Sequence, residues 1–317
     1  MPEPGHIPVL LSQTLDLLQP QPQQRFLDCT LGRGGHAEAL IPRIAGGRFV
    51  GLDRDAANAA FARQRLAPLA EQHAVELQVI HADFGGYVAQ AGDRFDGVLA
   101  DLGFASNQMD DPGRGFSFMT DGPLDMRLDV SSGQPAASLV NDLPEKALAD
   151  LIYRFGEERL SRRIARKIIE RRAQSPIQGT AELAEICRRA YPPPSRPRKG
   201  GRPGRGIHPA TRTFQALRIA VNGELEALDA LLSSLPGLLT ERGRIGIISF
   251  HSLEDRPVKQ RFLQLQQQDL AERLTRKPLT ADEDEIARNP RSRSAKLRGL
   301  ARGRSGKYPP PPSSRID

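Results

Sequence analysis

Short apolar runs alternate with amphipathic stretches through the first hundred or so residues of the chain. The apolar runs predict buried strands at 26–30, 48–52, 75–81 and 95–100. Helical patterns lie between the first three of them, at 37–44 and 55–69. Strands that alternate with helices are typical of a parallel, doubly wound sheet, so this part of the chain predicts an α/β fold.

The alternation of predicted strands and helices stops after residue 107. A segment rich in Gly, Asp, Ser and Pro predicts a long loop, and helical patterns follow at 143–155, 157–173 and 180–191. The middle one has one apolar and one basic face. We therefore expect an inserted, mainly helical and basic domain at 108–207, within a sheet domain made of 1–107 and 208–317.

The sheet pattern returns beyond the insert. A helix is expected after His208, and a fifth apolar strand at 244–250 leads into a helix at 253–270. Two short strand-like runs, at 272–279 and 294–301, follow with an acidic turn between them. Five parallel strands and a terminal hairpin predict a seven-stranded, Rossmann-like sheet.

The first predicted strand runs into a glycine-rich turn, Asp28-Cys29-Thr30-Leu31-Gly32-Arg33-Gly34-Gly35-His36. A strand, a glycine turn and a helix start, in that order, open a nucleotide-binding βαβ unit. Glycine suits such a turn because the backbone bends tightly and a ligand can approach its N–H groups. The same residues also build ordinary surface turns. The turn alone therefore does not define a ligand site.

An aspartate stands near the end of each of the four predicted strands: Asp28, Asp53, Asp83 and Asp101. The carboxyl ends of parallel strands lie along one edge of a sheet, where ligands bind. Asp53 follows Gly32 by about 20 residues, the spacing at which an acid accepts hydrogen bonds from ribose hydroxyls. A nicotinamide cofactor would also satisfy that spacing. The acids after the third and fourth strands favour S-adenosylmethionine, which offers them an adenine amine and two positive charges.

The net charge of the 317-residue chain is +7 at pH 7, and it is unevenly distributed. No acidic residue occurs at 186–223, and Asp317 is the only one at 287–317. Two such basic segments favour a nucleic-acid partner over a merely solvated face. The sequence shows no membrane-spanning run and no signal-peptide pattern. Two cysteines far apart, Cys29 and Cys187, fit a reducing compartment, so a cytoplasmic protein is expected.

Longer motifs make the chain resemble one family. They comprise the glycine turn and the segments 6–10, 52–55, 101–110, 114–119, 122–127, 153–158, 208–215, 249–255 and 289–298. Among them are Tyr153-x-Phe-Gly-Glu-Glu158, His208-Pro-Ala-Thr-Arg-Thr-Phe-Gln215 and Ser249-Phe-His-Ser-Leu-Glu-Asp255. Over nearly its whole length the chain is similar to the bacterial small-subunit ribosomal RNA cytosine-N4 methyltransferases, which use S-adenosylmethionine.

The resemblance implies methyl transfer from S-adenosylmethionine to the exocyclic N4 amine of a cytosine in the decoding region of small-subunit ribosomal RNA. It implies cofactor contacts from Gly34, Gly35, His36, Asp53, Phe84, Asp101 and Gln108. In the family Asp53 would bind the ribose and Phe84 would lie beside the adenine. Ala105 departs from the family pattern, where a serine is usual, and this puts any hydroxyl contact there in doubt. No metal site is predicted.

A cytosine amine needs hydrogen-bond acceptors on its hydrogens, because the nitrogen lone pair is delocalised into the ring. Other amine methyltransferases place an Asn/Asp-Pro-Pro-aromatic turn after the fourth strand, where this chain has Asp101-Leu-Gly-Phe104. We hypothesise that Asp101, or a nearby carbonyl, accepts from the amine and that Phe104 supports the base. The alternative, which the resemblance favours, is that Asp101 binds the cofactor ammonium. His251, after the fifth strand, is either a proton acceptor or a hydrogen-bonded loop anchor.

The basic loop at 195–206 is the predicted phosphate-binding segment. The candidate RNA contacts are Arg196, Arg198, Lys199, Arg202 and Arg205, with Arg212 at the next helix start as an RNA contact or a solvent-facing residue. A cytosine must be swung out of its stack to react, so we expect the assembled small subunit as substrate. A non-catalytic RNA-binding protein and a nicotinamide-dependent oxidoreductase are the alternatives. The oligomeric state stays open, a homodimer included.

Overall fold

The computed structural model describes residues 8–90, 92–192 and 208–303. The chain forms two compact units, the first made of Met1–Gly103 and Leu225–Asp317 and the second of Phe104–Glu224. The first contains a seven-stranded sheet and the second is helical. Among the helices of the described ranges, none has the length and apolar character that a membrane crossing requires.

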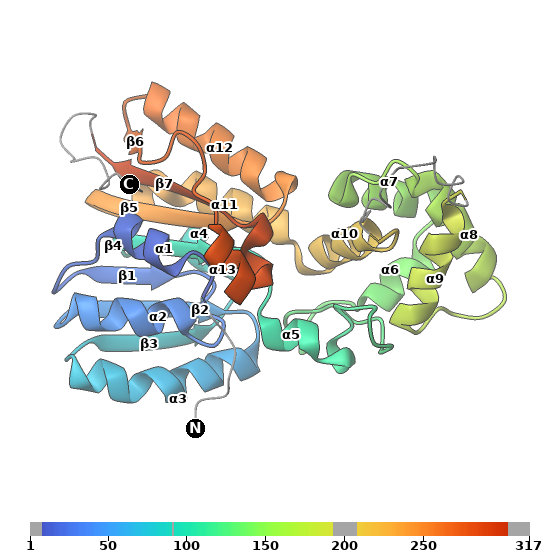
Figure 1. Cartoon of the computed structure of the whole chain (residues 1–317), viewed down its shortest axis with the longest axis horizontal. Helices are drawn as coiled ribbons and strands as arrows, with labels where there is room; N and C mark the ends of the chain where they lie inside the picture. Colours follow the sequence, from blue (N-terminus) through green and yellow to red (C-terminus); the bar gives the residue numbers. More distant parts are fainter. Residues whose placement is uncertain (1–7, 91, 193–207, 304–317) are drawn as a thin grey trace. The chain divides into compact units, whose positions relative to one another are not determined.

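The strands of the first unit form one sheet in the order β3-β2-β1-β4-β5-β7-β6 (Figure 1). They are β1 (Arg25–Asp28), β2 (Arg48–Asp53), β3 (Glu76–His81), β4 (Phe95–Asp101), β5 (Leu239–Ser249), β6 (Ala271–Arg273) and β7 (Lys296–Arg302). Strands β1 to β5 pair with one another in parallel. Strand β7 runs antiparallel to both β5 and β6. This confirms the predicted five parallel strands with an antiparallel terminal pair.

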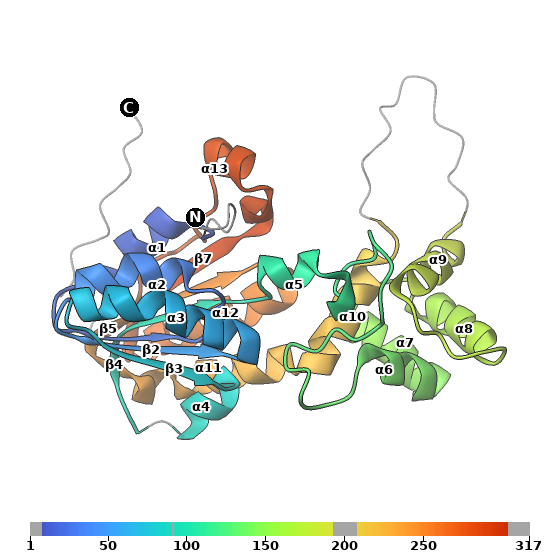
Figure 2. The same cartoon turned by 90° about the horizontal axis from the view of Figure 1, so that it is seen from below.

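Successive side chains of the central strands enter two different cores, one on each face of the sheet. Phe26 and Leu99 lie in one core, and their neighbours Leu27 and Val98 lie in the other. Helices α1, α2 and α3 supply the first core, and α4, α11 and α12 the second; Figure 2 shows α2 and α3 above the sheet and α4 below it. Because both faces are buried, the strands read as nearly continuous apolar runs.

The helices that cover the sheet include three that the sequence predicted and four that it did not. They are α1 (Leu11–Leu18), α2 (Gly35–Leu40), α3 (Ala56–Gln72), α4 (Phe84–Gln90), α11 (Glu224–Leu238), α12 (Ser252–Gln267) and α13 (Glu283–Arg288), with short 3-10 turns at η1 (Ile41–Ile44) and η3 (Pro290–Ser294). α2, α3 and α12 confirm the predicted helices. α1, α4 and α13 span only six to eight residues, whereas α11 has a regular helical period of buried apolar side chains, Ala227, Leu228, Leu231, Leu232 and Leu235, that the sequence prediction missed.

The second unit has its own hydrophobic core, built by packed helices. They are α5 (Ser106–Asp110), η2 (Pro112–Arg114), α6 (Ala136–Asp142), α7 (Glu145–Gly156), α8 (Ser161–Arg172), α9 (Thr180–Ala190) and α10 (Thr211–Asn222). Ile152 of α7 and Ile164 and Ile168 of α8 are fully buried in this core. The predicted helices at 143–155, 157–173 and 180–191 correspond to α7, α8 and α9.

Helix α10 belongs to the helical unit, although the sequence pattern assigned it to the sheet domain. Its Phe214 and Leu217 are buried in the helical core. A Cβ added to Gly156 would lie 2.5 Å from the carbonyl oxygen of Arg212, so α7 and α10 approach with no side chain between them. The observed boundary is therefore at Glu224, later than the expected one at residue 207.

Candidate active site at the carboxyl edge of the sheet

Two carboxylates, the buried Asp28 and the partly buried Asp53, hold the glycine turn after β1. Asp53, the last residue of β2, accepts a hydrogen bond from the Gly32 N–H at 2.7 Å, and its other oxygen accepts from the Asp55 N–H at 2.7 Å. Asp28, the last residue of β1, accepts from the Thr30 N–H at 3.0 Å. Gly32 has a φ of +55°, which glycine adopts without steric cost. The predicted turn is thus fixed by the acids of the strands beside it.

The glycines next to the start of α2 are needed for close packing. Gly34 has a φ of +87°, and a Cβ on it would meet the Leu66 side chain at 3.1 Å. A Cβ on Gly35 would lie 2.8 Å from Cγ of Pro8. Their side-chain positions are therefore occupied by protein. A ligand at Gly34 and Gly35 would have to bind through the backbone, most directly through the N–H groups that open α2.

His36 links the N-terminal segment to the end of β4. Its ring is buried, and Nε2 lies 3.0 Å from the Val9 carbonyl oxygen. On the other side, Nδ1 lies 3.8 Å from Oδ2 of Asp101. The geometry makes His36 an internal support of the acidic edge, whereas the family resemblance implied a cofactor contact.

Asp101 ends β4 beside the glycine turn. Its N–H donates to Oγ1 of Thr30 at 2.6 Å, which joins the end of β4 to the turn. Its Oδ1 is buried and has no hydrogen-bond partner among the residues that the structure describes. A buried, unpaired carboxylate oxygen costs free energy unless a ligand supplies a donor or a positive charge. Asp101 is therefore the strongest candidate for a direct ligand contact.

Three acids of this edge, Asp28, Asp53 and Asp101, have raised pKa values. Burial raises the pKa of Asp28 to about 7, although hydrogen bonds from Thr30 oppose the shift. Burial likewise raises the pKa of Asp53 to about 7, against the hydrogen bonds from Asp55 and Gly32. For Asp101, burial first and then the charges of Asp28 and Glu254 raise the pKa well above its usual range. A bound cation would favour the ionised form of all three acids.

The end of β3 is less enclosed. Asp83 accepts from the Gly86 N–H at 3.1 Å and lies 3.5 Å from the Arg54 guanidinium. Phe84, which begins α4, is partly buried and packs against the core below the sheet. Both residues stand where the sequence predicted them, at the carboxyl end of β3.

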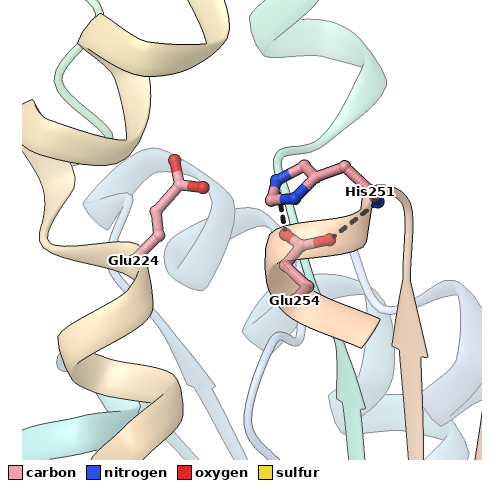
Figure 3. A group of neighbouring side chains, drawn as sticks. All are labelled: Glu224, His251 and Glu254. Atoms are coloured by element: carbon pink, nitrogen blue, oxygen red, sulfur yellow. Dashed lines mark hydrogen bonds and ion pairs between the residues drawn. The ribbon is translucent and has the colours of Figure 1, made fainter. Parts of the chain in front are cut away.

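His251, at the carboxyl end of β5, forms a pair with Glu254 in the first turn of α12 (Figure 3). The ring Nε2 lies 3.2 Å from Oε1 of Glu254, while Oε2 of Glu254 accepts from the N–H groups of Phe250 and His251 at 2.8 and 3.3 Å. Glu254 itself is buried. The arrangement matches the loop-anchor interpretation of His251, and it leaves a role in proton transfer as a proposal.

Sequence reasoning missed Glu254 and its neighbour Asp255. The available signal was an acid three residues after the helix start, the spacing of a capping box. Asp255 accepts two hydrogen bonds from Arg298 of β7, at 2.6 and 3.1 Å, and so ties the start of α12 to the antiparallel end of the sheet. That long-range pair has no local sequence signal.

Two predicted site residues, Phe104 and Gln108, belong to the helical unit. Phe104 stacks on Phe116 with ring centroids 5.1 Å apart, and the Arg218 guanidinium lies 4.8 Å from its ring. Arg218 in turn forms two 2.8 Å hydrogen bonds with Glu224, which is also drawn in Figure 3. Gln108 is buried and accepts from the Ala105 N–H, which caps α5.

Of the predicted RNA contacts, Arg212 is the one that the structure describes. It is exposed at the start of α10, and its Nη1 lies 3.4 Å from the Glu157 carbonyl oxygen. The predicted contacts in the basic loop, Arg196, Arg198, Lys199, Arg202 and Arg205, lie outside the described residues.

The described acids at this edge suit a positively charged ligand. Asp28, Asp53 and Asp101 form no ion pair with a Lys or Arg among the described residues, and each approaches the glycine turn. S-adenosylmethionine carries a sulfonium and an ammonium group, so the residues present fit that cofactor. A five-stranded parallel sheet extended by an antiparallel pair, with this acid-lined turn at its carboxyl edge, defines a Rossmann-like methyltransferase domain.

Comparison with known proteins agrees with this class. The profile of the MraW methylase family matches residues 3–302, and the chain belongs to that family. A "Ribosomal RNA small subunit methyltransferase H" of Synechococcus sp. CC9902 is 50% identical over 310 residues, which are 96% of this chain and 100% of the relative. Proteins of the same name from Picosynechococcus sp. PCC 7002 and Sorangium cellulosum are 49% and 46% identical, over 92% and 94% of this chain and 95% and 90% of theirs.

Proposed function

We propose that this chain transfers a methyl group from S-adenosylmethionine to the exocyclic N4 amine of a cytosine in the decoding region of small-subunit ribosomal RNA. Family membership and the names of its relatives support the RNA substrate. The motifs shared with cytosine-N4 methyltransferases support the base and the atom. The observation that carries the proposal is the buried Oδ1 of Asp101 beside the glycine turn, which has no hydrogen-bond partner among the described residues.

The cofactor would bind between the glycine turn and the acids at the strand ends. It supplies an electrophilic methyl group on a sulfonium when bound. Asp53 would accept from the ribose hydroxyls with the lone pairs that its bonds to Gly32 and Asp55 leave free. The N–H groups at the start of α2 would bind an anionic part of the cofactor. Phe84 would pack beside the adenine.

Asp101 has two chemically distinct roles open to it. As an ammonium ligand it would hold the methionine part of the cofactor, and this is the role that the family resemblance favours. As an acceptor for the cytosine amine it would localise the nitrogen lone pair and take the released proton. Its raised pKa suits the second role, because a carboxylate that readily binds a proton is the better base.

A dinucleotide cofactor fits this edge poorly. Its pyrophosphate would bring negative charge close to Asp28, whose own charge already repels those of Asp53 and Asp101. The alternative of a nicotinamide-dependent oxidoreductase is therefore disfavoured. Calorimetry provides the direct comparison, with binding of S-adenosylmethionine or S-adenosylhomocysteine expected and no binding of NAD.

The assembled small subunit is the proposed substrate, and the cytoplasm is the proposed compartment. Swinging a stacked cytosine out of a helix costs a few kcal/mol. A loop already shaped by ribosomal proteins would lower that cost. Purified subunits should thus accept methyl groups faster than protein-free ribosomal RNA does.

The decisive experiment uses small subunits from a bacterial strain that lacks the enzyme. Tritiated S-adenosylmethionine and purified protein are added, the RNA is digested, and the labelled nucleoside is identified. Label in N4-methylcytidine is the expected result. Label in another nucleoside would exclude the cytosine amine, and unlabelled RNA would favour a non-catalytic RNA-binding protein.

A further inference from the structure

The turn between α7 and α8 gathers exposed basic residues around an exposed aromatic ring. We call this surface the α7–α8 corner and define it by Tyr153, Arg154, Arg159, Arg162, Arg163 and Arg166. Tyr153 is 62% exposed. Arg162, Arg163 and Arg166 project from one side of α8, since residues three and four apart share a helix face, and Ile164 and Ile168 on the opposite side are buried. The basic face of α8 is therefore presented outward.

The cations at this corner are largely uncompensated. Arg159, Arg162 and Arg163 form no hydrogen bond or ion pair with other described residues, and Arg166 approaches Glu145 only to 3.8 Å. Other arginines of the same unit do have close acidic partners, as the pairs Arg127–Asp125, Arg171–Glu182, Arg188–Glu185 and Arg218–Glu224 show. The positive charge of the corner is therefore able to bind an external anion.

The turn between α7 and α8 also contacts Tyr191 and Arg212, which are described residues on either side of the segment 193–207. Glu158, within the turn, is buried and accepts a 2.6 Å hydrogen bond from the hydroxyl of Tyr191, which follows α9. On the other side of the loop, Arg212 donates to the Glu157 carbonyl oxygen at 3.4 Å. These contacts bring the described flanks of the segment 193–207 to the α7–α8 turn.

We propose that the α7–α8 corner is an RNA-binding surface, at which the arginines contact successive phosphates and Tyr153 stacks on an unpaired base. This inference rests on the proposed function. Guanidinium groups bind phosphate oxygens through paired hydrogen bonds, and an exposed aromatic ring beside a basic track is how proteins hold single-stranded RNA. A flat basic helix face without an aromatic ring would fit a duplex backbone equally well, so Tyr153 is what favours an unpaired segment.

The test compares three triple variants in the small-subunit methylation assay. The first is Arg159→Gln with Arg162→Gln and Arg163→Gln. The second changes the same positions to Lys. The matched control is Lys259→Gln with Arg276→Gln and Lys277→Gln, which removes the same charge from exposed sites of the sheet unit. Circular dichroism and calorimetric binding of S-adenosylhomocysteine verify that each variant is folded.

We expect the first variant to raise KM for the small subunit about tenfold or more and to leave the cofactor Kd unchanged, since it removes binding energy that is common to ground and transition states. The slope of log KM against log salt should fall by roughly one for each phosphate that the variant no longer binds. The Lys variant should retain most of the affinity, because a phosphate contact needs the charge. Tyr153→Ala should weaken binding about fivefold or more, with Tyr153→Phe near wild type.

Two results would overturn the inference. One is a glutamine variant whose KM and salt slope equal those of the wild type, while the wild type methylates the subunit normally. The other is an equal loss of affinity in the glutamine variant and the control, which would mean that only the net charge matters. Failure of the wild type to methylate RNA would instead count against the proposed function, so the two failures are distinguishable.

Discussion

At the scale of single residues, a variant of Asp101 can distinguish the two roles proposed for this side chain, binding of the cofactor ammonium and acceptance of a hydrogen bond from the cytosine amine. Asp101→Asn keeps the shape of the side chain and removes its charge. If Asp101 binds the cofactor ammonium, the Kd for S-adenosylhomocysteine should rise by about tenfold or more, because a charged hydrogen bond at a buried site contributes about 1.5–3 kcal/mol. If it accepts from the cytosine amine, kcat should fall about a hundredfold or more with an unchanged Kd. Calorimetry and single-turnover methylation measure both quantities.

A matched control for this variant is Asp93→Asn, which changes a partly exposed acid that pairs with Arg25 and Arg48 before the start of β4. Its effect on kcat should be small. Normal turnover and normal cofactor affinity in Asp101→Asn would contradict both roles and leave the unpaired Oδ1 without a function.

The raised pKa values of Asp28 and Asp53 lead to a prediction about pH. Both groups have a pKa of about 7 in the folded protein, above the usual range of a carboxyl group in an unfolded chain. Between about pH 4 and pH 7 the folded state therefore binds more protons than the unfolded state does. The sign of the linkage means that the free energy of unfolding of the cofactor-free protein falls as the pH rises through this window.

We accordingly expect a lower Tm at pH 8 than at pH 5.5 for the cofactor-free protein, measured by calorimetry. Cofactor affinity should change in the opposite direction and strengthen with rising pH, because the ionised acids attract the cation. Asp28→Asn should flatten the pH dependence of Tm. A Tm that rises from pH 5.5 to pH 8 would contradict the assignment of these pKa values.

At the scale of elements, the N-terminal segment and α2 depend on each other through Gly35. The substitution Gly35→Ala places a Cβ close to Cγ of Pro8, at a separation of 2.8 Å. We expect a loss of about 1–3 kcal/mol in the free energy of unfolding, as is usual for overpacking. Pro8→Ala removes the clashing atom, so the double variant should recover much of the loss, and urea unfolding of the four proteins measures the coupling.

Gly92→Ala is the control for that series, since no described residue other than its chain neighbours lies within 4 Å of the added Cβ. Its stability should be close to that of the wild type. Additive losses from Gly35→Ala and Pro8→Ala would mean that the contact with Pro8 does not limit the size of residue 35.

The same elements show how far the sequence predicts the fold. The central parallel strands could be predicted because both of their faces are buried, which makes β1, β4 and most of β5 compact apolar runs, whereas the edge strand β3 shows only a loose alternation. The position of Asp28, Asp53 and Asp101 at the carboxyl edge of the sheet could be predicted because each ends a strand. The link from His36 to the Val9 carbonyl was not, since it joins residues far apart in sequence through a backbone atom that carries no side-chain signal. The end of the helical unit was missed for a related reason: the apolar face of α10 fits a helical core as well as a sheet.

At the scale of the whole molecule, the acidic groups proposed to bind the cofactor and the basic groups proposed to bind RNA belong to different units of the chain. The edge that would hold the cofactor is acidic and largely shielded from solvent, whereas the charge proposed to bind RNA lies on exposed arginines of the helical unit such as Arg159 and Arg162. Buried charges are screened weakly by salt and exposed ones strongly. A chain of net charge +7 can therefore bind a cation at one site and a polyanion at another without either site cancelling the other.

This separation predicts different salt responses for the two ligands. When NaCl is raised from about 50 to about 200 mM, KM for the small subunit should rise by more than about tenfold, because each phosphate contact releases counterions. The Kd for S-adenosylhomocysteine should change by less than about threefold, since the acids proposed to contact it are largely shielded from solvent. Methylation kinetics and calorimetry at several salt concentrations provide the two slopes. Equal slopes would show that the cofactor edge is open to solvent ions, and a flat slope for the subunit would exclude phosphate binding as the main source of RNA affinity.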